Sequence, residues 1–126
     1  MITLKNENCS LEIVFDVQVN DLPSNGDVYV SIKVESNGFS GTNDLWVLAA
    51  EFKEFYHDLK LLEEKRKGSA TLNSISPNEL NMKIFSIDSL GHMAVKGQTG
   101  YTIDGFKHSI TFGFEFDPHY LTEAIK

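Results

Sequence analysis

A single segment of the chain has a helical period. Between residues 48 and 67 the sequence reads LAAEFKEFYHDLKLLEEKRK, with large apolar side chains at steps of four and three residues. This spacing places these side chains along one face of an α-helix. They are Leu48, Phe52, Phe55, Leu59 and Leu62. The rest of the chain is mostly strand-like, so one amphipathic helix is expected to cover a face of a sheet.

The end of this helix is better marked than its start. A basic run precedes Gly68, and cations followed by a left-handed glycine suit a helix C-terminus. At the start, Asn43 or Asp44 could act as the N-cap, or the preceding residues are extended and the helix begins near Leu48. We favour the second reading, because Trp46 suits a strand and no Glu or Gln completes a capping box.

Length and composition favour one soluble domain. The chain has 126 residues, of which 41% are hydrophobic, and this is enough for a single domain spanning 1–126. No apolar run is long enough to cross a bilayer, and the N-terminus lacks the charged start and apolar middle of a signal peptide. The single cysteine, Cys9, cannot form an internal disulfide. We therefore expect a cytoplasmic protein with no membrane partner.

The charge balance limits the class of partner. The formal net charge is −7, and Arg66 is the only arginine. Binding of nucleic acid requires lysine and arginine to neutralise phosphates, so we expect no nucleic-acid partner. An acidic chain suits a basic protein partner, although a mild acidic excess also serves solubility alone. The excess is uneven, because seven acidic residues but only two lysines fall within residues 1–45.

The acidic region coincides with a predicted hairpin. Apolar and polar residues alternate over residues 11–19 and again over 28–34, and the intervening DLPSNGD is rich in turn residues. Such alternation indicates two antiparallel strands with one buried and one hydrated face. We expect the hydrated face to carry most of the acidic excess. The acidic side chains assigned to it are Glu12, Asp16, Asp27 and Glu35.

The remaining segments complete an α+β fold. We expect a short edge strand at residues 1–5 and a hairpin made from residues 69–75 and 79–87. Residues 36–44 are polar and glycine-rich, and they form either a loop or the opening of an edge strand. With the last hairpin included, the prediction is an antiparallel sheet of about six to seven strands packed on the helix at 48–67.

Asp104-Gly105 fixes the register of the last hairpin. A two-residue turn of this type pairs Ile103 with Phe106, and every further pair follows from it. Asp117 then caps a terminal helix at 118–126, with proline at its first position. Large side chains of the second strand should form a wall of the core against the helix stripe. They are Phe106, Ile110, Phe112, Phe114 and Phe116.

The chain offers few candidates for catalysis. It has no glycine-rich phosphate loop, Cys-x-x-Cys, His-Glu-x-x-His or nucleophile elbow, and its four histidines are scattered. We expect no cofactor and no metal. The hairpin register places His92 opposite Asp117. This pair is either an acid–base dyad or, in the reading we favour, an ion pair at the strand ends.

Aromatic residues supply a second candidate site. Tyr101 and His108 face each other near the hairpin tip, as a simple aromatic pair or as one wall of a small pocket, and we favour the pair. Trp46 is either a core residue, which we favour, or an exposed anchor for a partner. If a pocket exists between sheet and helix, its predicted lining is Trp46, Tyr101 and His108.

The order of these signals resembles that of a group of small bacterial proteins. The shared pattern is a pair of strands, a tryptophan-bearing segment, a helix of the form Leu-x3-Phe-x2-Phe-x3-Leu, an Asp-x2-Gly-His step and a strand ending Phe-x-Phe-Asp-Pro. The residues that carry it are Trp46, Leu48, Phe52, Phe55, Leu59, Asp88, Gly91, His92, Phe114, Phe116, Asp117 and Pro118. Some similar proteins are immunity proteins of the WapI type, which protect a cell from a contact-delivered toxin whose C-terminal domain is a nuclease.

This resemblance implies a binding protein and not an enzyme, and it carries over no active-site residue. The implied partner is a basic toxin domain, which an acidic sheet face could block, with the four acidic residues above as the candidate contacts. The alternative is a small-ligand-binding or enzymatic α+β domain that uses the aromatic pocket. The sequence does not indicate the oligomeric state.

Overall fold

The computed structural model describes residues 1–19, 21–22 and 25–125. Pro23 and Ser24 of the predicted turn, and Lys126 of the predicted terminal helix, lie outside the described residues. The described elements, in chain order, are β1 (Ile2–Lys5), β2 (Cys9–Val17), β3 (Val28–Ser36), β4 (Phe39–Val47), α1 (Ala49–Lys65), β5 (Ser69–Asn73), β6 (Leu80–Ser86), β7 (Met93–Ile103), β8 (Phe106–Phe116) and α2 (His119–Ala124).

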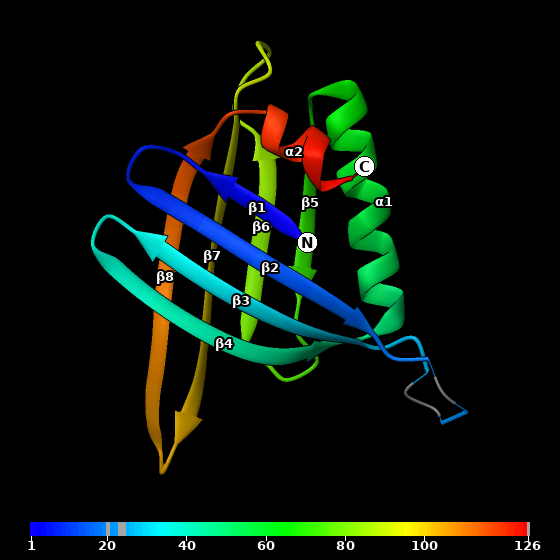
Figure 1. Ribbon diagram of the computed structural model, residues 1–126, viewed down its shortest axis with the longest axis vertical. Helices are drawn as coiled ribbons and strands as arrows, with labels where there is room; N and C mark the ends of the chain where they lie inside the picture. The colour runs from blue at the N-terminus through cyan, green and yellow to red at the C-terminus, as the bar shows by residue number, and fades with distance from the viewer. Residues whose placement is uncertain (20, 23–24, 126) are drawn as a thin grey trace.

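The strands form two antiparallel sheets, and this confirms the α+β prediction. Each described sheet has four strands in sequence order, β1 to β4 in the first and β5 to β8 in the second. Figure 1 shows the strands of the first sheet crossing those of the second, with α1 beside β5. The strands are therefore divided between two facing layers, whereas the sequence pattern had suggested one sheet covered by a helix.

β4 is a full strand, where the sequence left a choice between a loop and an edge strand. Asn37 and Gly38 have φ angles of 48° and 92°. These left-handed conformations are those of a tight two-residue turn, which returns the chain so that Ser36 pairs with Phe39. β4 thus extends the first sheet by one strand and forms its outer edge.

The core lies between the two sheets. Alternate residues of each strand are buried because side chains of a strand point in turn to opposite faces. The predicted inward positions of the first hairpin are confirmed for Leu11 and Ile13 on β2 and for Val30 and Ile32 on β3. Val17 is exposed at the end of β2.

The β7–β8 hairpin has the register that its turn predicts. Asp104 and Gly105 have φ angles of 53° and 81°, and the pairing runs from Ile103–Phe106 to Met93–Phe116. The predicted aromatic wall is correct for Phe112, Phe114 and Phe116, which are buried. It is wrong at its other end, since Ile110 is only half-buried and Phe106 is 71% exposed.

The length of this hairpin explains the error. Figure 1 shows its tip extending past β4, where no strand of the first sheet lies over it. The buried part of β8 contacts β1, β3 and β4, while α1 contacts β5 and β6. The wall therefore packs against the first sheet, and the prediction that it packs against the helix stripe is wrong.

The helix begins where the favoured reading placed it. Leu48 has extended backbone angles and α1 starts at Ala49. Phe55, Leu59 and Leu62 are buried, and Phe52 is half-buried with its ring centroid 5.0 Å from that of Phe15. Leu48 is 50% exposed, against prediction, because a side chain outside the helical turn does not share the direction of the stripe.

The end of α1 also differs in detail from the prediction. Arg66, with φ of 57°, is the left-handed residue, and its backbone N–H donates to the Leu62 carbonyl at 2.8 Å. The left-handed cap therefore comes two residues before Gly68, which also has a positive φ of 103°. The terminal helix α2 is shorter than the predicted 118–126 and starts at His119, so Pro118 and not Asp117 occupies the N-cap position. The Asp117 carboxylate still accepts the His119 N–H at 2.9 Å, and Leu121 is buried.

Candidate functional site

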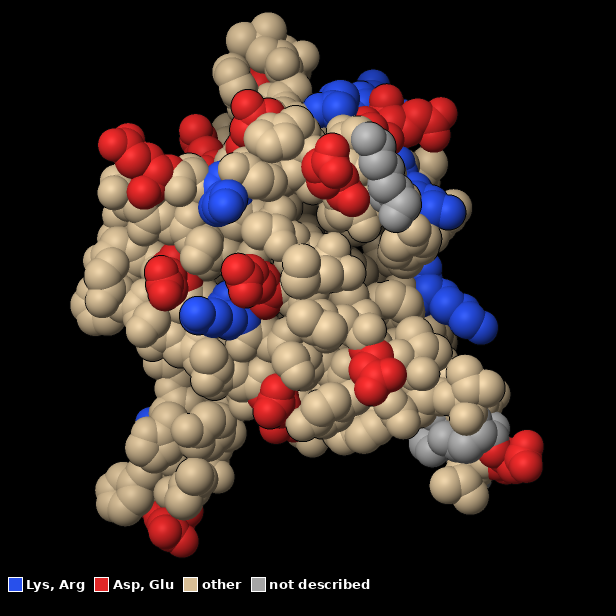
Figure 2. Space-filling model, in the orientation of Figure 1, with Lys and Arg blue, Asp and Glu red and all other residues tan. Residues whose placement is uncertain are grey.

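The outer side of the first sheet gathers the charged residues of β2, β3 and β4. Strand alternation turns one set of side chains into the core and the other set toward solvent. We call this solvent side of β1–β4 the acidic face. Its outward residues on β2 to β4 are Ser10, Glu12, Val14, Asp16, Tyr29, Ser31, Lys33, Glu35, Ser40, Thr42, Asp44 and Trp46. Figure 2 shows acidic side chains spread over this side, with fewer basic ones among them.

The strand register arranges these residues in rows across the sheet. Glu12, Lys33 and Thr42 form one row. Val14, Ser31 and Asp44 form the next row. Since facing residues on neighbouring strands lie about 5 Å apart, each row presents a fixed order of charge and shape.

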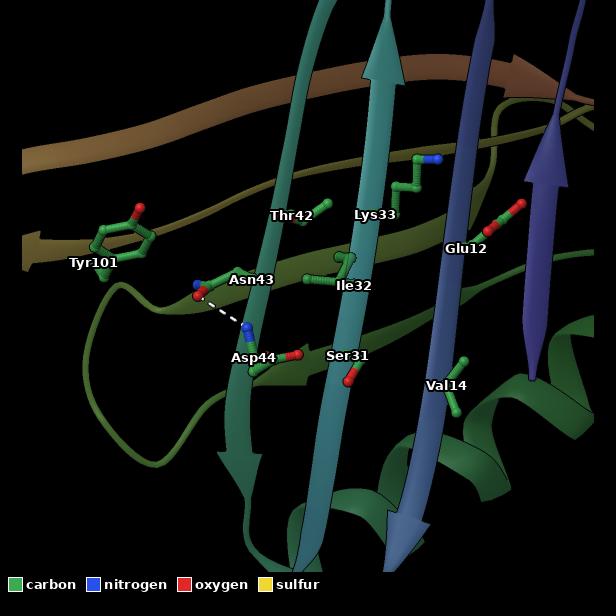
Figure 3. Close-up of a pocket in the computed structure, with 9 residues that line it drawn as sticks. All are labelled: Glu12, Val14, Ser31, Ile32, Lys33, Thr42, Asn43, Asp44 and Tyr101. Atoms are coloured by element: carbon green, nitrogen blue, oxygen red, sulfur yellow. Dashed lines mark hydrogen bonds between the residues drawn. The ribbon is translucent and has the colours of Figure 1, made fainter.

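A shallow hollow lies at the centre of the acidic face. It has a volume of about 470 Å³, and the small side chains of Ser31 and Thr42 lie between the larger residues around it. Glu12 and Lys33 border it over β2 and β3, and Tyr101 borders it beyond β4 (Figure 3). The hollow is therefore a shallow depression in the surface of the sheet, bounded on one side by the β7–β8 hairpin.

The carboxylates of this face form no salt bridge with any residue that the structure describes. Among the described residues, no salt bridge reaches Glu12, Asp16, Glu35 or Asp44, and all four are exposed. The described ion pairs lie elsewhere, at Arg66–Glu63 and at two histidines. The negative charge of the face is thus not neutralised by any of the described ion pairs.

An aromatic pair ends the third row of this face. Asp16, Tyr29 and Trp46 face one another across β2, β3 and β4. The rings of Tyr29 and Trp46 have centroids 5.1 Å apart and are tilted by 59°. Trp46 is 41% exposed, so the favoured assignment of this residue to the core is wrong. It lies on β4 with its side chain on the solvent side, because β4 alternates as a true strand.

The four predicted acidic residues do not all share this face. Glu12, Asp16 and Glu35 lie on it, each on the outward side of its strand. Asp27 precedes β3, is half-buried, and its Oδ1 accepts the Ala49 N–H at 3.0 Å. It thereby satisfies one of the free donors at the start of α1, where negative charge is also favoured by the helix dipole.

Sequence reasoning missed Asp44 and Tyr29 as members of the face. The signal that could have found them is the Asn37-Gly38 dipeptide, which is a strong hairpin turn. A two-residue turn there pairs Ser36 with Phe39, and the same register sets Asp44 beside Ser31 and Trp46 beside Tyr29.

The residues of the predicted aromatic pocket are only partly brought together. Tyr101 and His108 are paired, with ring centroids 5.6 Å apart, and both are exposed on the projecting hairpin. They line a hollow of about 520 Å³ between β4 and the hairpin, so this hollow does not lie between sheet and helix. Trp46 instead packs against Tyr29 with tilted rings, three residues along β4 from Asn43, which does line the hollow.

The predicted His92–Asp117 pair is wrong. His92 Nδ1 lies 2.6 Å from Asp88 Oδ2, whereas Asp117 lies 3.0 Å from His119 Nδ1. The hydrogen bond between the first two side chains lowers the pKa of Asp88 and raises the pKa of His92. The pKa of Asp117 is lowered mainly by the bond from the His119 backbone N–H.

Local geometry explains this exchange of partners. His92 follows Asp88 by four residues in the loop between β6 and β7, and Asp88 also accepts the backbone N–H groups of Leu90 and His92. Both ion pairs are exposed and close short loops, so they do not form an acid–base dyad across the strand ends. Within the described residues, no group of three His, Cys, Asp or Glu side chains could hold a metal ion, and no helix is long and apolar enough to span a membrane.

Comparison with known proteins connects this chain to one family. A protein-family model described as the Immunity protein WapI-like family matches residues 2–126. No curated protein and no solved structure matches the chain.

Proposed function

The chain belongs to the immunity protein WapI-like family, and from this membership we propose that it neutralises a cognate toxin by binding it at the acidic face. The coarse role, toxin neutralisation, is what the family suggests. The proposed mechanism is steric and electrostatic blockade without catalysis. The proposed partner is a basic domain of the toxin.

The observation that carries this proposal is the set of unpaired carboxylates on the acidic face. Four exposed carboxylates lie on the strands of one sheet, and none has an ion pair with a described residue. Because the strands already hold their backbone, only the side chains must be ordered when a partner binds, which reduces the entropic cost of association. Such a surface attracts a basic partner and accelerates its association at low salt.

The row of Asp16, Tyr29 and Trp46 supplies a contact of defined chemistry. Its carboxylate suits a guanidinium or ammonium group, and its two rings suit the same cation through cation–π contact. A half-exposed tryptophan packed against a tyrosine is also the type of residue that dominates binding energy at interfaces. We therefore place an arginine or lysine side chain of the toxin on this row.

The test uses the C-terminal domain of the cognate toxin, identified from a low-salt pull-down with the tagged chain. Glu12→Lys with Asp16→Lys reverses two charges on the acidic face. A matched control, Glu54→Lys with Glu64→Lys, makes the same charge change on exposed positions of α1. The proposal predicts that the first variant loses affinity and salt dependence, while the control keeps most of both.

Two outcomes would argue against the proposal. In the first, both double variants bind the toxin domain with equal affinity and equal salt dependence. In the second, no toxin domain binds, and a small molecule instead raises the melting temperature of the chain, as expected for a ligand-binding domain. Mutations at Tyr101 and His108 would then test the hollow between β4 and the hairpin.

A further inference from the structure

One edge of the first sheet is open along β4. In an antiparallel ladder, the N–H and C=O groups of alternate residues both point away from the neighbouring strand. On β4 these are the even-numbered residues, since the Trp46 carbonyl accepts the Ile75 N–H at 2.9 Å, away from β3. The Asp44 N–H likewise points outward and donates to Asn43 Oδ1 at 2.9 Å.

These two hydrogen bonds close one end of the edge and leave the other end free. Among the described residues, no hydrogen bond reaches the outward backbone groups of Ser40 and Thr42. Exposed strand edges are templates for a further strand, and proteins usually block them with lysine, proline or a bulge. β4 contains no lysine or proline, and its pairing with β3 runs without a bulge from Phe39 to Val47.

The projecting tip of the β7–β8 hairpin lies beside this open edge. The hollow of about 520 Å³ separates them, with residues 40–43 on one side and residues 99–101 and 107–110 on the other. We call this hollow the edge groove. The same face of the hairpin presents Tyr101, Ile103 and Phe106, which are exposed although they continue the core side of the strand pair.

We propose that the edge groove takes an extended segment of the toxin as an added strand beside β4. This inference rests on the proposed function and names a second element of the same interface. The Ser40 and Thr42 backbone groups would supply main-chain hydrogen bonds, which give affinity independently of sequence. The hairpin would form the surface against which every second side chain of the segment packs.

The two sides of the groove determine the chemistry of that segment. Side chains on the solvent side of an added strand would continue the rows that contain Glu35 and Asp44, so basic residues fit there. Side chains on the other side would face Tyr101, His108 and Ile110, so apolar residues fit there. Lys107 also lines this side of the groove, so basic residues are disfavoured there. The segment is therefore expected to alternate basic and apolar residues.

The first experiment uses a synthetic probe. A blocked peptide of about eight residues alternating lysine and valine, close to the usual length of a strand, is added to the intact chain. Amide hydrogen exchange is followed by NMR. Exchange at the Ser40 and Thr42 amides should slow about tenfold at saturating peptide, because these groups become hydrogen-bonded. A peptide of the same sequence, N-methylated at alternate residues, keeps the charges and should give no protection.

Variants of β4 separate strand addition from simple charge attraction. Thr42→Pro removes an outward N–H and no hydrogen bond to β3, so an edge strand should tolerate it. It should abolish the slowed exchange and weaken peptide and toxin binding, whereas Thr42→Ala should retain both. If Thr42→Pro does not fold, Ser40→Pro and the N-methylated peptide make the same distinction.

Three results would overturn the proposal. One is binding of the plain and N-methylated peptides with equal affinity and no protection at Ser40 and Thr42. Another is that charge reversal on the acidic face weakens binding of the toxin domain, whereas Thr42→Pro binds it as tightly as the wild type does. This result would leave the proposed function intact. The last is protection of the Ser40 and Thr42 amides that rises with protein concentration without peptide, together with a dimer in sedimentation. The edge groove would then be occupied by a second copy of the chain.

Discussion

The side-chain amide of Asn43 on β4 donates a hydrogen bond of 2.9 Å to the Gly100 carbonyl on β7, and so joins the two sheets. The same nitrogen lies 3.1 Å from Thr99 Oγ1, and the Thr99 hydroxyl donates to the Glu79 carbonyl at 2.6 Å. Thr99 is the only buried polar residue in the described part of the chain. This small polar network fixes where the edge of the first sheet lies over the hairpin.

Asn43→Ala should lower the free energy of unfolding by about 1–3 kcal/mol, because it removes hydrogen bonds to partly buried groups. Urea unfolding followed by circular dichroism measures the change. Thr42→Ala is the neighbouring control, since this exposed side chain should alter stability by no more than about 0.5 kcal/mol. Equal effects of the two substitutions would mean that the network contributes no stability.

The helix stripe gives a second comparison, between two leucines of the same predicted face. Leu59 is fully buried and Leu48 is 50% exposed. Leu59→Ala should lower the free energy of unfolding by about 2–5 kcal/mol, because it removes buried methyl groups and leaves a cavity. Leu48→Ala should lower it by less than about 1 kcal/mol. Chemical denaturation of both variants tests this order, and a larger loss for Leu48→Ala would contradict the placement of α1.

Asp27 is expected to act in folding more than in binding. Asp27→Ala should reduce stability by about 1 kcal/mol through loss of the bond to the Ala49 N–H, while Asp27→Asn should retain most of it, since asparagine also caps helices. Asp44→Ala, on an exposed carboxylate of the acidic face, serves as the stability control. If Asp27→Ala leaves the unfolding midpoint unchanged, the bond to the helix start contributes nothing.

The loop pair His92–Asp88 predicts a pH effect with a defined sign. The pKa of His92 is raised in the folded chain, so its protonated ring stabilises the fold fully when the pH is below the pKa of the unfolded chain, near 6.5. This contribution is lost as the pH rises through the folded pKa. The pKa of Asp88 is lowered in the folded chain, so its carboxylate stabilises the fold fully when the pH is above the pKa of the unfolded chain, near 3.8. This contribution is lost as the pH falls through the folded pKa. The pair therefore contributes most between these two unfolded values.

NMR titration of the His92 ring checks this expectation. In the wild type the His92 pKa should lie above 6.5, and Asp88→Asn should move it back toward 6.5 because the carboxylate partner is lost. Asp104→Asn, in the distant hairpin turn, should leave the His92 titration unchanged. A His92 pKa unaffected by Asp88→Asn would show that the pair does not form in solution.

Local patterns in the sequence were enough to predict most strands and their pairing. The Asp104-Gly105 turn fixed eleven facing pairs of β7 and β8, because a two-residue turn allows one register. Alternation likewise identified the outward positions of Glu12 and Asp16. These features depend on neighbours in the chain, so they can be read without knowledge of the tertiary structure.

The errors arise where tertiary packing decides the outcome. Phe106 continues the alternation of buried phenylalanines, yet it is exposed because the hairpin is longer than the sheet that covers it. His92 faces the position of Asp117 in the register, yet Asp88 is closer because the loop folds back on itself. The division of the strands into two sheets is also absent from local periodicity, since each strand shows the same alternation in either arrangement.

The last prediction concerns Trp46 and rests on the proposed function. Trp46→Ala should weaken binding of the toxin domain by about 2 kcal/mol or more, roughly thirtyfold in Kd, because it removes an exposed ring that packs against Tyr29 beside Asp16. Trp46→Phe should give a smaller loss, since it keeps an aromatic face for a cation. Phe39→Ala removes a more exposed aromatic residue, 74% accessible, from the other end of the same strand. Isothermal titration calorimetry of these variants compares the two ends of β4. A larger loss for Phe39→Ala than for Trp46→Ala would move the main contact to the turn between β3 and β4 and away from the aromatic pair.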